Sequence, residues 1–349
     1  MKTILFAIFL VASLSSSGIA GNTLGKGNRL ILATYWGDDK VALLDLEGEP
    51  GKEEIWVLDT LKAAGCSKPY DIRSNRRGDT AYVSCSGTNQ IAIVDVVAQQ
   101  VKAVIETGQS PRDLILFDDD KRLIVANSGN DTVSIIDTAE RKKLYDFPIS
   151  TQPYGVAVTR DGKTALVTGW ASGDLHFVSL GEASADYLGK VDVGLLPYTV
   201  SLAGDPQVAY VAANGNHKVV AVDIDQQSVV NEIKVGRNPW SLAASPQGDS
   251  LLVTNNRSNN LSLLKTGAAP AAALPQPATI SAGAEVMANG ASVERAAKNA
   301  SISANGESAV FTDLANNQIV LVDLDTGAIK KAIDVGKAPY GIEYLKSPE

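Results

Sequence analysis

The chain has 349 residues, with 31 basic and 39 acidic side chains and a formal net charge of −8 at pH 7. Because 45% of the residues are hydrophobic and only 20% are charged, the chain can bury enough apolar surface to fold, which excludes intrinsic disorder. Two cysteines and two histidines exclude a disulfide-dense scaffold, an iron–sulfur protein and a cysteine-rich zinc module. This composition disfavours an enzyme that uses histidine or metal chemistry, and we expect no cofactor and no metal.

The first twenty residues have the pattern of a secretory signal peptide. Lys2 is followed by an apolar run over residues 4–14, too short to cross a bilayer, and then by small residues that end at Ala20. We expect cleavage after Ala20, so that residues 21–349 form a single domain in the periplasm or the secreted fraction. An uncleaved membrane anchor is the alternative. No later apolar stretch is long enough to span a membrane.

A block of about 42 residues recurs through the rest of the chain. Most copies begin with Gly, two residues, Pro and an aromatic residue, and most also contain a strand whose last residue is Asp. The prolines lie at positions 69, 111, 153, 197, 239 and 339, and a further copy near Asn299 lacks the proline. The strand-end aspartates are Asp45, Asp95, Asp137, Asp223 and Asp323, with Ser179 and Lys265 in the same place in two further copies. The two markers together indicate seven copies.

Each copy is predicted to form four short strands. In the fourth copy these are residues 154–159, 164–168, 175–180 and 186–191, with an Asp-Gly turn after the first. Four strands per repeat of this length, without a helical period, are typical of a β-propeller blade. We therefore predict an all-β fold, a seven-bladed β-propeller of four-stranded antiparallel blades. Because the first copy lacks its Pro-aromatic strand, residues 339–344 are expected to join the first blade and close the ring.

The middle strand of each copy carries a recurring tetrad, for example Tyr82-Val83-Ser84-Cys85 and Leu252-Val253-Thr254-Asn255. With the Pro-Tyr-Gly-Val sequence at residue 153 and the Arg-Asp-Gly-Lys turn at residue 160, it resembles the YVTN-type repeat of YncE-like exported β-propellers, over about Asn28 to Leu345. The resemblance implies seven blades but no particular activity. It also implies two precedents, since some such relatives are linked to single-stranded DNA and similar propellers form the large subunit of amine dehydrogenases.

The two cysteines are expected at the same rim of the propeller. Cys66 precedes the inner strand of the second copy, and Cys85 ends the strand that pairs with it. In an oxidising compartment they would form a structural disulfide, and two free thiols are the alternative.

Two copies carry extra residues. Residues 47–62 lengthen the link after the first copy, and residues 267–295 form an insert rich in Ala, Pro and Gly. We expect this insert to be a surface loop, with a lid or a partner-docking loop as the alternative.

The residues after the prolines are the strongest candidates for a ligand site. In a propeller they would lie at one mouth of the central channel, a common place for ligands. The candidate ligand-binding residues are Tyr70, Arg112, Tyr154, Tyr198, Trp240 and Tyr340, together with Trp36 and Trp170 in polar loops of the same face. Packing between neighbouring blades is the alternative role of the repeated aromatics, and it explains Trp36 and Trp170 less well. Such a set of aromatics could hold a sugar, a base or a peptide segment.

The other polar candidates fit structural roles better. The strand-end aspartates recur before turns and are interpreted as turn caps. His176 and His217 have no His or Cys at metal-ligand spacing. Arg73, Arg76 and Arg77 are placed in one solvated hairpin turn. We therefore assign no catalytic and no metal-binding residue.

These observations favour a non-catalytic binding or scaffold propeller that recognises a protein, peptide or glycan at the channel mouth. An enzyme is the first alternative, either a metal-dependent lactonase or hydrolase whose loop carboxylates converge, or a subunit of a redox system. Single-stranded nucleic-acid binding through the aromatics is the second, and the acidic net charge disfavours it. We expect a monomer.

Overall fold

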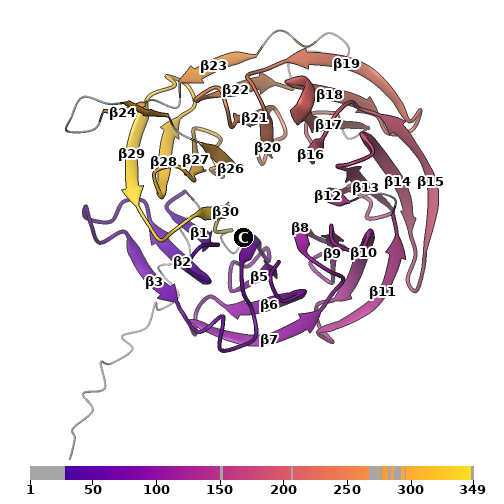
Figure 1. Cartoon of the computed structure of the whole chain (residues 1–349), viewed down its shortest axis with the longest axis horizontal. Helices are drawn as coiled ribbons and strands as arrows, with labels where there is room; N and C mark the ends of the chain where they lie inside the picture. Colours follow the sequence, from indigo (N-terminus) through magenta and orange to yellow (C-terminus); the bar gives the residue numbers. More distant parts are fainter. Residues whose placement is uncertain are drawn as a thin grey trace, which may run out of the picture.

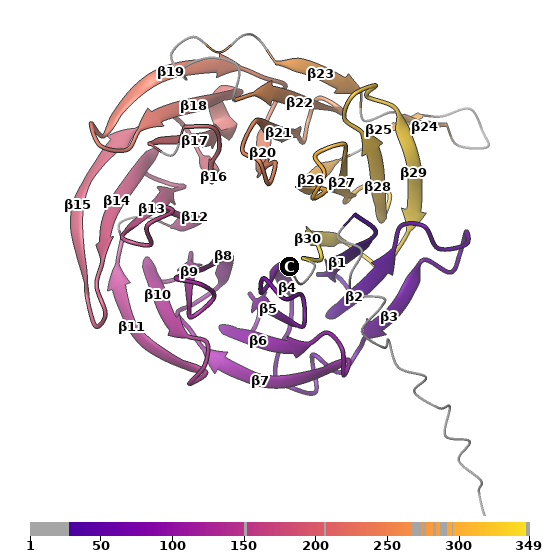
Figure 2. The same ribbon diagram turned by 180° about the vertical axis from the view of Figure 1, so that it is seen from behind.

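Seven four-stranded antiparallel sheets surround a central channel as the blades of a propeller (Figures 1 and 2). They are seen in a computed structural model, which describes residues 28–149, 152–205, 207–266, 274, 277–281, 284–286, 292–294 and 296–346. The predicted all-β fold is confirmed, since these residues contain no helix except the short 3₁₀ segment η1 (Asn214–Asn216). The expected signal peptide lies outside the described residues.

Each blade runs from an inner strand beside the channel to an outer strand at the rim (Figure 1). The first blade contains β30 (Pro339–Tyr344), β1 (Leu30–Tyr35), β2 (Lys40–Asp45) and β3 (Glu54–Leu58). The second contains β4 (Pro69–Ser74), β5 (Thr80–Cys85), β6 (Gln90–Asp95) and β7 (Gln100–Glu106). The third contains β8 (Pro111–Phe117), β9 (Arg122–Asn127), β10 (Thr132–Asp137) and β11 (Lys142–Pro148).

The remaining four blades have the same order. The fourth contains β12 (Pro153–Val158), β13 (Thr164–Gly169), β14 (Asp174–Leu180) and β15 (Ala185–Asp192). The fifth contains β16 (Pro197–Leu202), β17 (Val208–Ala213), β18 (Lys218–Asp223) and β19 (Ser228–Lys234). The sixth contains β20 (Pro239–Ala244), β21 (Ser250–Asn255), β22 (Asn260–Lys265) and β23 (Ala278–Ser281). The seventh contains β26 (Ala297–Ile302), β27 (Ser308–Asp313), β28 (Gln318–Asp323) and β29 (Ile329–Asp334).

The ring closes where β30 joins the first blade, as predicted. This strand pairs antiparallel with β1, with Tyr344 opposite Ile31 and Ile342 opposite Ala33. Ile342 and Tyr344 are buried in the core between the first and seventh blades. The first blade therefore combines strands from distant parts of the sequence, and β30 gives it the inner strand that the other six blades have.

The hydrophobic core lies between adjacent blades. Both faces of each sheet pack on a neighbouring sheet, so the middle strands are apolar on both faces and β17 is buried along its whole length. Between the fifth and sixth blades, for example, Tyr210 and Val219 pack against Leu251 and Val253. This explains why the first two residues of the recurring tetrad, such as Leu252 and Val253, are both apolar although they point to opposite faces of the sheet.

The strand-end aspartates cap turns, as predicted. Asp95 Oδ1 accepts the backbone N–H groups of Val97 and Ala98 at 3.0 and 2.7 Å. Asp45, Asp137, Asp223 and Asp323 make equivalent bonds in four other blades. Each carboxylate thereby satisfies turn N–H groups that would otherwise lack a partner.

The insert after β22 differs in part from the expected surface loop. Ala278–Ser281 pairs with β22 and is the outer strand of the sixth blade, so it belongs to the propeller. β24 (Ala284–Val286) and β25 (Ser292–Glu294) form a separate two-stranded sheet, and most of the insert lies outside the described residues. Within the described part of the chain, no helix has the length and hydropathy needed to cross a membrane.

Candidate functional site

A β-bulge at the start of each inner strand turns side chains toward the channel. In the fourth blade, Tyr154 and Gly155 together oppose the single residue Thr168. Thr168 Oγ1 accepts the N–H of Gly155 and donates to the carbonyl of Tyr198 in the next blade, both at 2.8 Å. Four other blades have the same pair of bonds, from Thr34, Ser84, Thr254 and Thr312. The hydroxyl of the tetrad thus fixes the residue after the proline in the next blade.

The five residues fixed in this way meet around the channel axis together with Tyr154 and Trp240, which occupy the same position in the other two blades. We call them the channel ring, which consists of Tyr70, Arg112, Tyr154, Tyr198, Trp240, Lys298 and Tyr340. The ring centres of Tyr198 and Trp240 are 3.8 Å apart, and those of Tyr70 and Tyr340 are 4.2 Å apart. The Tyr70 hydroxyl also bonds to the hydroxyls of Tyr154 and Tyr340. All six residues selected after the prolines are therefore brought into one contiguous group.

Two cations complete the channel ring. The Arg112 guanidinium carbon lies 4.6 Å from the ring centre of Tyr70 and 5.4 Å from that of Tyr154. Lys298 Nζ lies 3.2 Å from the ring centre of Trp240. Lys298 is absent from the sequence-based candidates because Ala297 stands where the other copies have proline. Aligning Thr312 with the third residue of the tetrad would have placed Lys298 in the ring.

Burial changes the titration of the channel-ring side chains. It raises the pKa of Tyr340 to about 12, and it raises the pKa values of Tyr70 and Tyr154 as well, so these phenols remain neutral at physiological pH. Burial, with a contribution from the charge of Arg257, lowers the pKa of Lys298 to about 8. The ring therefore presents neutral hydroxyls and two cationic groups.

The two tryptophans selected outside the repeat pattern lie at the same mouth. Trp36 N–H donates to the carbonyl of Ala338, next to the start of β30, and the Trp36 side chain is 36% exposed. Lys68 Nζ lies 5.2 Å from the Trp36 ring centre. Trp170 is half-buried, with its ring centre 6.4 Å from that of Tyr198. Both tryptophans therefore form part of the rim around the channel ring.

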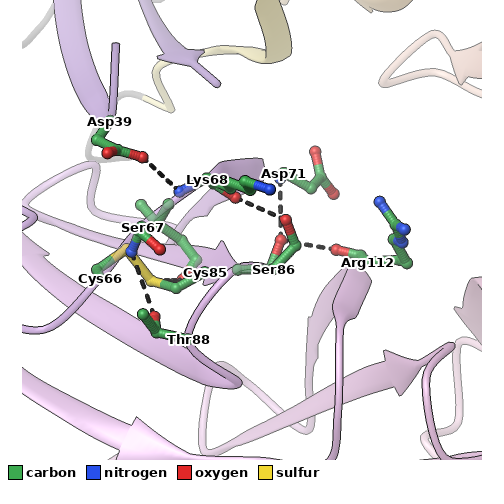
Figure 3. The surroundings of a disulfide bond; sticks show 11 residues. Asp39, Cys66, Ser67, Lys68, Asp71, Cys85, Ser86, Thr88 and Arg112 are labelled. Carbon is green, nitrogen blue, oxygen red and sulfur yellow. Dashed lines mark hydrogen bonds between the residues drawn. A yellow bond between two sulfur atoms is a disulfide. The ribbon is translucent and has the colours of Figure 1, made fainter. Parts of the chain in front are cut away.

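A disulfide joins Cys66 and Cys85, as predicted, at the mouth end of the second blade (Figure 3). Both residues are fully buried. Their bridge lies beside the loop that carries Lys68, whose N–H donates to Asp39 Oδ1 at 2.6 Å. The disulfide therefore holds in place the loop that presents Lys68 to Trp36.

Behind the channel ring, a cavity of about 210 Å³ continues along the channel. Tyr70, Tyr154 and Trp240 line it at the mouth end, whereas Arg112 and Lys298 do not line it. The wall on the fifth, sixth and seventh blades carries no charge, and its apolar side chains are interspersed with the polar residues Thr199, Ser201, Ser241, Asn299 and Ser301. The wall on the first three blades carries the charged residues Asp71, Arg73, Asp113 and Glu343.

Arg73 is the centre of this charged cluster. Its guanidinium donates to Asp71 Oδ1 at 2.8 Å and to Asp113 Oδ1 at 3.4 Å. Its predicted place in a solvated turn is wrong, because β4 extends to Ser74 and keeps Arg73 in the channel wall. Asp71, Arg73 and Glu343 alternate with apolar residues along their strands, a sequence pattern that indicates one face of the strand turned away from the core.

The Asp71 carboxyl group of this cluster has a raised pKa. Its side chain is buried, and its Oδ2 atom has no hydrogen-bond partner among the described residues. Burial raises the pKa of Asp71 to about 8, the neighbouring charge of Arg73 opposes this change, and Asp113 adds to it. The cluster therefore retains a proton at pH values where a free aspartate has lost it.

The other polar candidates have structural surroundings. Arg76 and Arg77 lie in an exposed turn, as expected. Burial lowers the pKa of His176, whose Nδ1 lies 3.3 Å from the Tyr187 hydroxyl. His217 Nδ1 lies 3.1 Å from a loop carbonyl oxygen. Over the ranges that the structure describes, no group of three His, Cys, Asp or Glu side chains is arranged to hold a metal ion.

Comparisons with known proteins agree with the fold. A family profile described as "Lactonase, 7-bladed beta-propeller" matches residues 36–147, and no curated protein matches the sequence significantly. A functionally unknown protein from Desulfotomaculum acetoxidans DSM 771 superimposes with a TM-score of 0.77 at 11% identity, covering 92% of this chain and 100% of the other.

Two structures whose names state an activity also have a similar fold. A candidate 6-phosphogluconolactonase from Bacteroides fragilis NCTC 9343 has a TM-score of 0.68 at 15% identity, over 90% of this chain and 97% of the other. A streptogramin B lyase has a TM-score of 0.65 at 14% identity, over 80% and 87%. At such identities the likeness extends to the fold alone. The chain is a seven-bladed β-propeller in which residues 36–147, from β2 of the first blade to β11 of the third, match the lactonase profile.

Proposed function

We propose that this propeller is an exported binding protein that recognises a peptide, protein or glycan ligand at the channel mouth. The channel ring carries the proposal, because five aromatic side chains and two cations converge at one end of the channel. Aromatic faces pack on sugar rings and on peptide side chains, and phenol and indole groups add directional hydrogen bonds. The half-exposed Trp36 and Trp170 extend this surface outward.

The loop before β16 supports the same face. Leu195 and Leu196 are 63% and 36% exposed, where the equivalent loop of the next blade has Arg237 and Asn238. The loop leads into Tyr198, which contacts Trp170, so the apolar side chains continue the aromatic rim. A departure from a polar repeat position toward exposed leucine is typical of a contact surface.

Export to the periplasm or the cell exterior is part of the proposal. It rests on the signal-peptide pattern of residues 1–20 and on the buried Cys66–Cys85 disulfide, which persists in oxidising compartments. Fractionation of the expressed chain tests it, because an unprocessed protein found only in the cytoplasm contradicts export.

The binding proposal is tested by screening peptides, glycans and a single-stranded oligonucleotide by thermal shift, followed by calorimetry. The variant Trp36→Ala/Trp170→Ala should weaken binding of any hit at least tenfold, because it removes the rim that the ligand contacts. Tyr187→Ala is the matched control, since Tyr187 is an exposed aromatic of the outer strand β15. Equal affinities of the rim variant and the wild type for every hit would refute the proposal.

Lactone hydrolysis is the second candidate function. Its specific support is that the lactonase profile covers β4 and β8, which carry Asp71, Arg73 and Asp113 beside the cavity. Hydrolysis adds water to the lactone carbonyl and returns a proton to the leaving alkoxide. A protonated Asp71 could supply that proton, Asp113 could accept one from water, and Arg73 could stabilise the developing oxyanion.

Hydrolysis of glucono-1,5-lactone followed in a pH-stat tests this second function. We expect Asp71→Asn to lower the rate above background at least 100-fold, whereas Asp119→Asn, an exposed turn carboxylate, should leave it unchanged. A wild-type rate equal to spontaneous hydrolysis would exclude this activity for the lactone used, and an unaffected Asp71→Asn rate would exclude the assigned roles.

A further inference from the structure

Lys298 is a buried cation without a counter-ion. Its side chain is 8% exposed, and no hydrogen bond or ion pair of its ammonium group occurs among the described residues. Its nearest favourable partner is the face of Trp240, at 3.2 Å from the ring centre. A cation–π contact satisfies none of the three N–H donors of an ammonium group. Burial without an acceptor is costly, so these donors are available to a ligand.

Arg112 has a similar deficit across the same ring. Its guanidinium stacks beside Tyr70 and Tyr154, and its Nε donates to Ser128 Oγ at 3.1 Å. In the part of the chain that the structure describes, no carboxylate lies within ion-pair distance of this guanidinium. The two terminal nitrogens of Arg112 therefore keep an unused donor edge.

The carboxylates at this mouth are already engaged with loop backbone. Asp38 Oδ2 accepts the N–H of Lys337 at 2.7 Å, and Asp131 Oδ1 accepts the N–H of Gln152 at 2.7 Å. The nearby Arg257 adds a third positive charge, which together with burial lowers the pKa of Lys298. Asp38 and Asp131 are thus engaged by loop N–H groups, while the cations of the ring have no acidic partner among the described residues.

We propose that Arg112 and Lys298 together bind an anionic group, a carboxylate or a phosphate, of the ligand that occupies the channel mouth. The proposal rests on the proposed binding function and specifies the chemistry of its ligand. An anion at this position supplies acceptors to the Lys298 ammonium and to the free edge of Arg112. The faces of Trp240 and Tyr198 then contact the remainder of the ligand, for which a sugar ring is suitable.

The probes are glucuronate, glucose 6-phosphate and glucose, which share a sugar ring and differ in charge. Calorimetry gives the affinity, and quenching of Trp fluorescence reports events beside Trp240. We expect one or both anionic sugars to bind at least tenfold more tightly than glucose. Binding of glucuronate alone identifies a carboxylate ligand, and binding of glucose 6-phosphate alone identifies a phosphate.

Variants separate this site from a general sugar surface. Lys298→Met keeps the side-chain volume over Trp240, and both it and Arg112→Gln should weaken binding of the anionic sugar at least tenfold. Lys121→Gln, an exposed lysine in the turn after β8, is the control and should bind as the wild type does. Circular dichroism and melting temperature establish that each variant is folded.

Two results would overturn the inference and leave the binding function standing. The first is equal affinity for glucose and both anionic sugars. The second is a ligand that is lost in the Trp36→Ala/Trp170→Ala variant but retained at full affinity in both cation variants. Failure of the rim variant to weaken any ligand would instead refute the binding function itself.

Discussion

The buried Asp71 carboxyl predicts an unusual dependence of stability on pH. Burial raises its pKa in the folded protein above the value of an unfolded aspartate, so the folded state holds a proton that the unfolded state releases. The contribution of this group to stability is therefore complete below about pH 4. It is lost as the pH rises toward about 8, the pKa of Asp71 in the folded protein.

The magnitude follows from proton linkage. Where the folded state binds one proton more than the unfolded state, the free energy of unfolding falls by about 1.4 kcal/mol per pH unit. Other groups titrate in the same range, since burial lowers the pKa of His176 and gives a slope of opposite sign below about pH 6.5. A variant that removes only the titration of Asp71 is needed to isolate its contribution.

Asp71→Asn is that variant, because the amide is neutral at every pH and can accept the hydrogen bond from Arg73. Urea denaturation followed by Trp fluorescence at pH 5, 6 and 7 gives the free energy of unfolding of both proteins. We expect the wild-type value minus the variant value to fall by about 1.4 kcal/mol with each pH unit. A difference that stays constant from pH 5 to pH 7, or rises, would refute a proton held by Asp71.

Three further predictions concern stability, each measured by urea denaturation. Cys66→Ser/Cys85→Ser should lower the free energy of unfolding by about 3 kcal/mol, the chain-entropy value for a loop closed over a separation of 19 residues. An unchanged free energy of unfolding when a reductant is added to the wild type would contradict this. Truncation after Ala338 removes β30 and exposes the partners of Ile342, Tyr344 and Leu345, which should lower the free energy of unfolding by about 5 kcal/mol or more. A folded product with an unchanged melting temperature would contradict the closing role of β30. Thr168→Val should lose about 1–3 kcal/mol because two buried hydrogen bonds disappear, and a loss below about 0.5 kcal/mol would mean that the hydroxyl does not tie the blades together.

The fold could be predicted from the sequence because each repeat contains the local sequence signals of its strands and turns. Strand-end aspartates, Gly-containing turns and the recurring tetrads each determine a strand or turn from nearby residues, and seven copies repeat this pattern. The closure by β30 could be predicted as well, since the first copy lacked a strand that the last copy supplied in excess. The fourth strand of the sixth blade was hidden, because an insert separates β22 from Ala278 and breaks the spacing.

The channel ring was predictable only where its residues follow a proline of the repeat. A preceding proline identifies six members of the channel ring, and Lys298 was not predicted because Ala297 precedes it in place of proline. The charged cluster was missed for a different reason. Arg73 bonds to Asp113 on the neighbouring third blade and lines the same cavity as Glu343 of the first blade. Such contacts between neighbouring blades are not visible in the sequence of a single repeat.

The asymmetry of the channel follows from where the repeats differ. Seven identical blades would give a channel wall with the same side chain in every direction around the axis, and such a wall cannot fix the rotation of a ligand about that axis. Here the first three blades supply all the charged groups of the cavity, and the fifth to seventh blades supply hydroxyl and amide groups. The two unpaired cations, Arg112 and Lys298, lie in the third and seventh blades at the mouth and not in the cavity. A ligand with an anionic end at the mouth and a polar body directed into the channel would meet complementary groups along its length, and reversing it would place its charge beside Asp71 and Glu343. For the proposed anionic ligand we therefore predict one orientation in the channel, set by the positions that depart from the repeat.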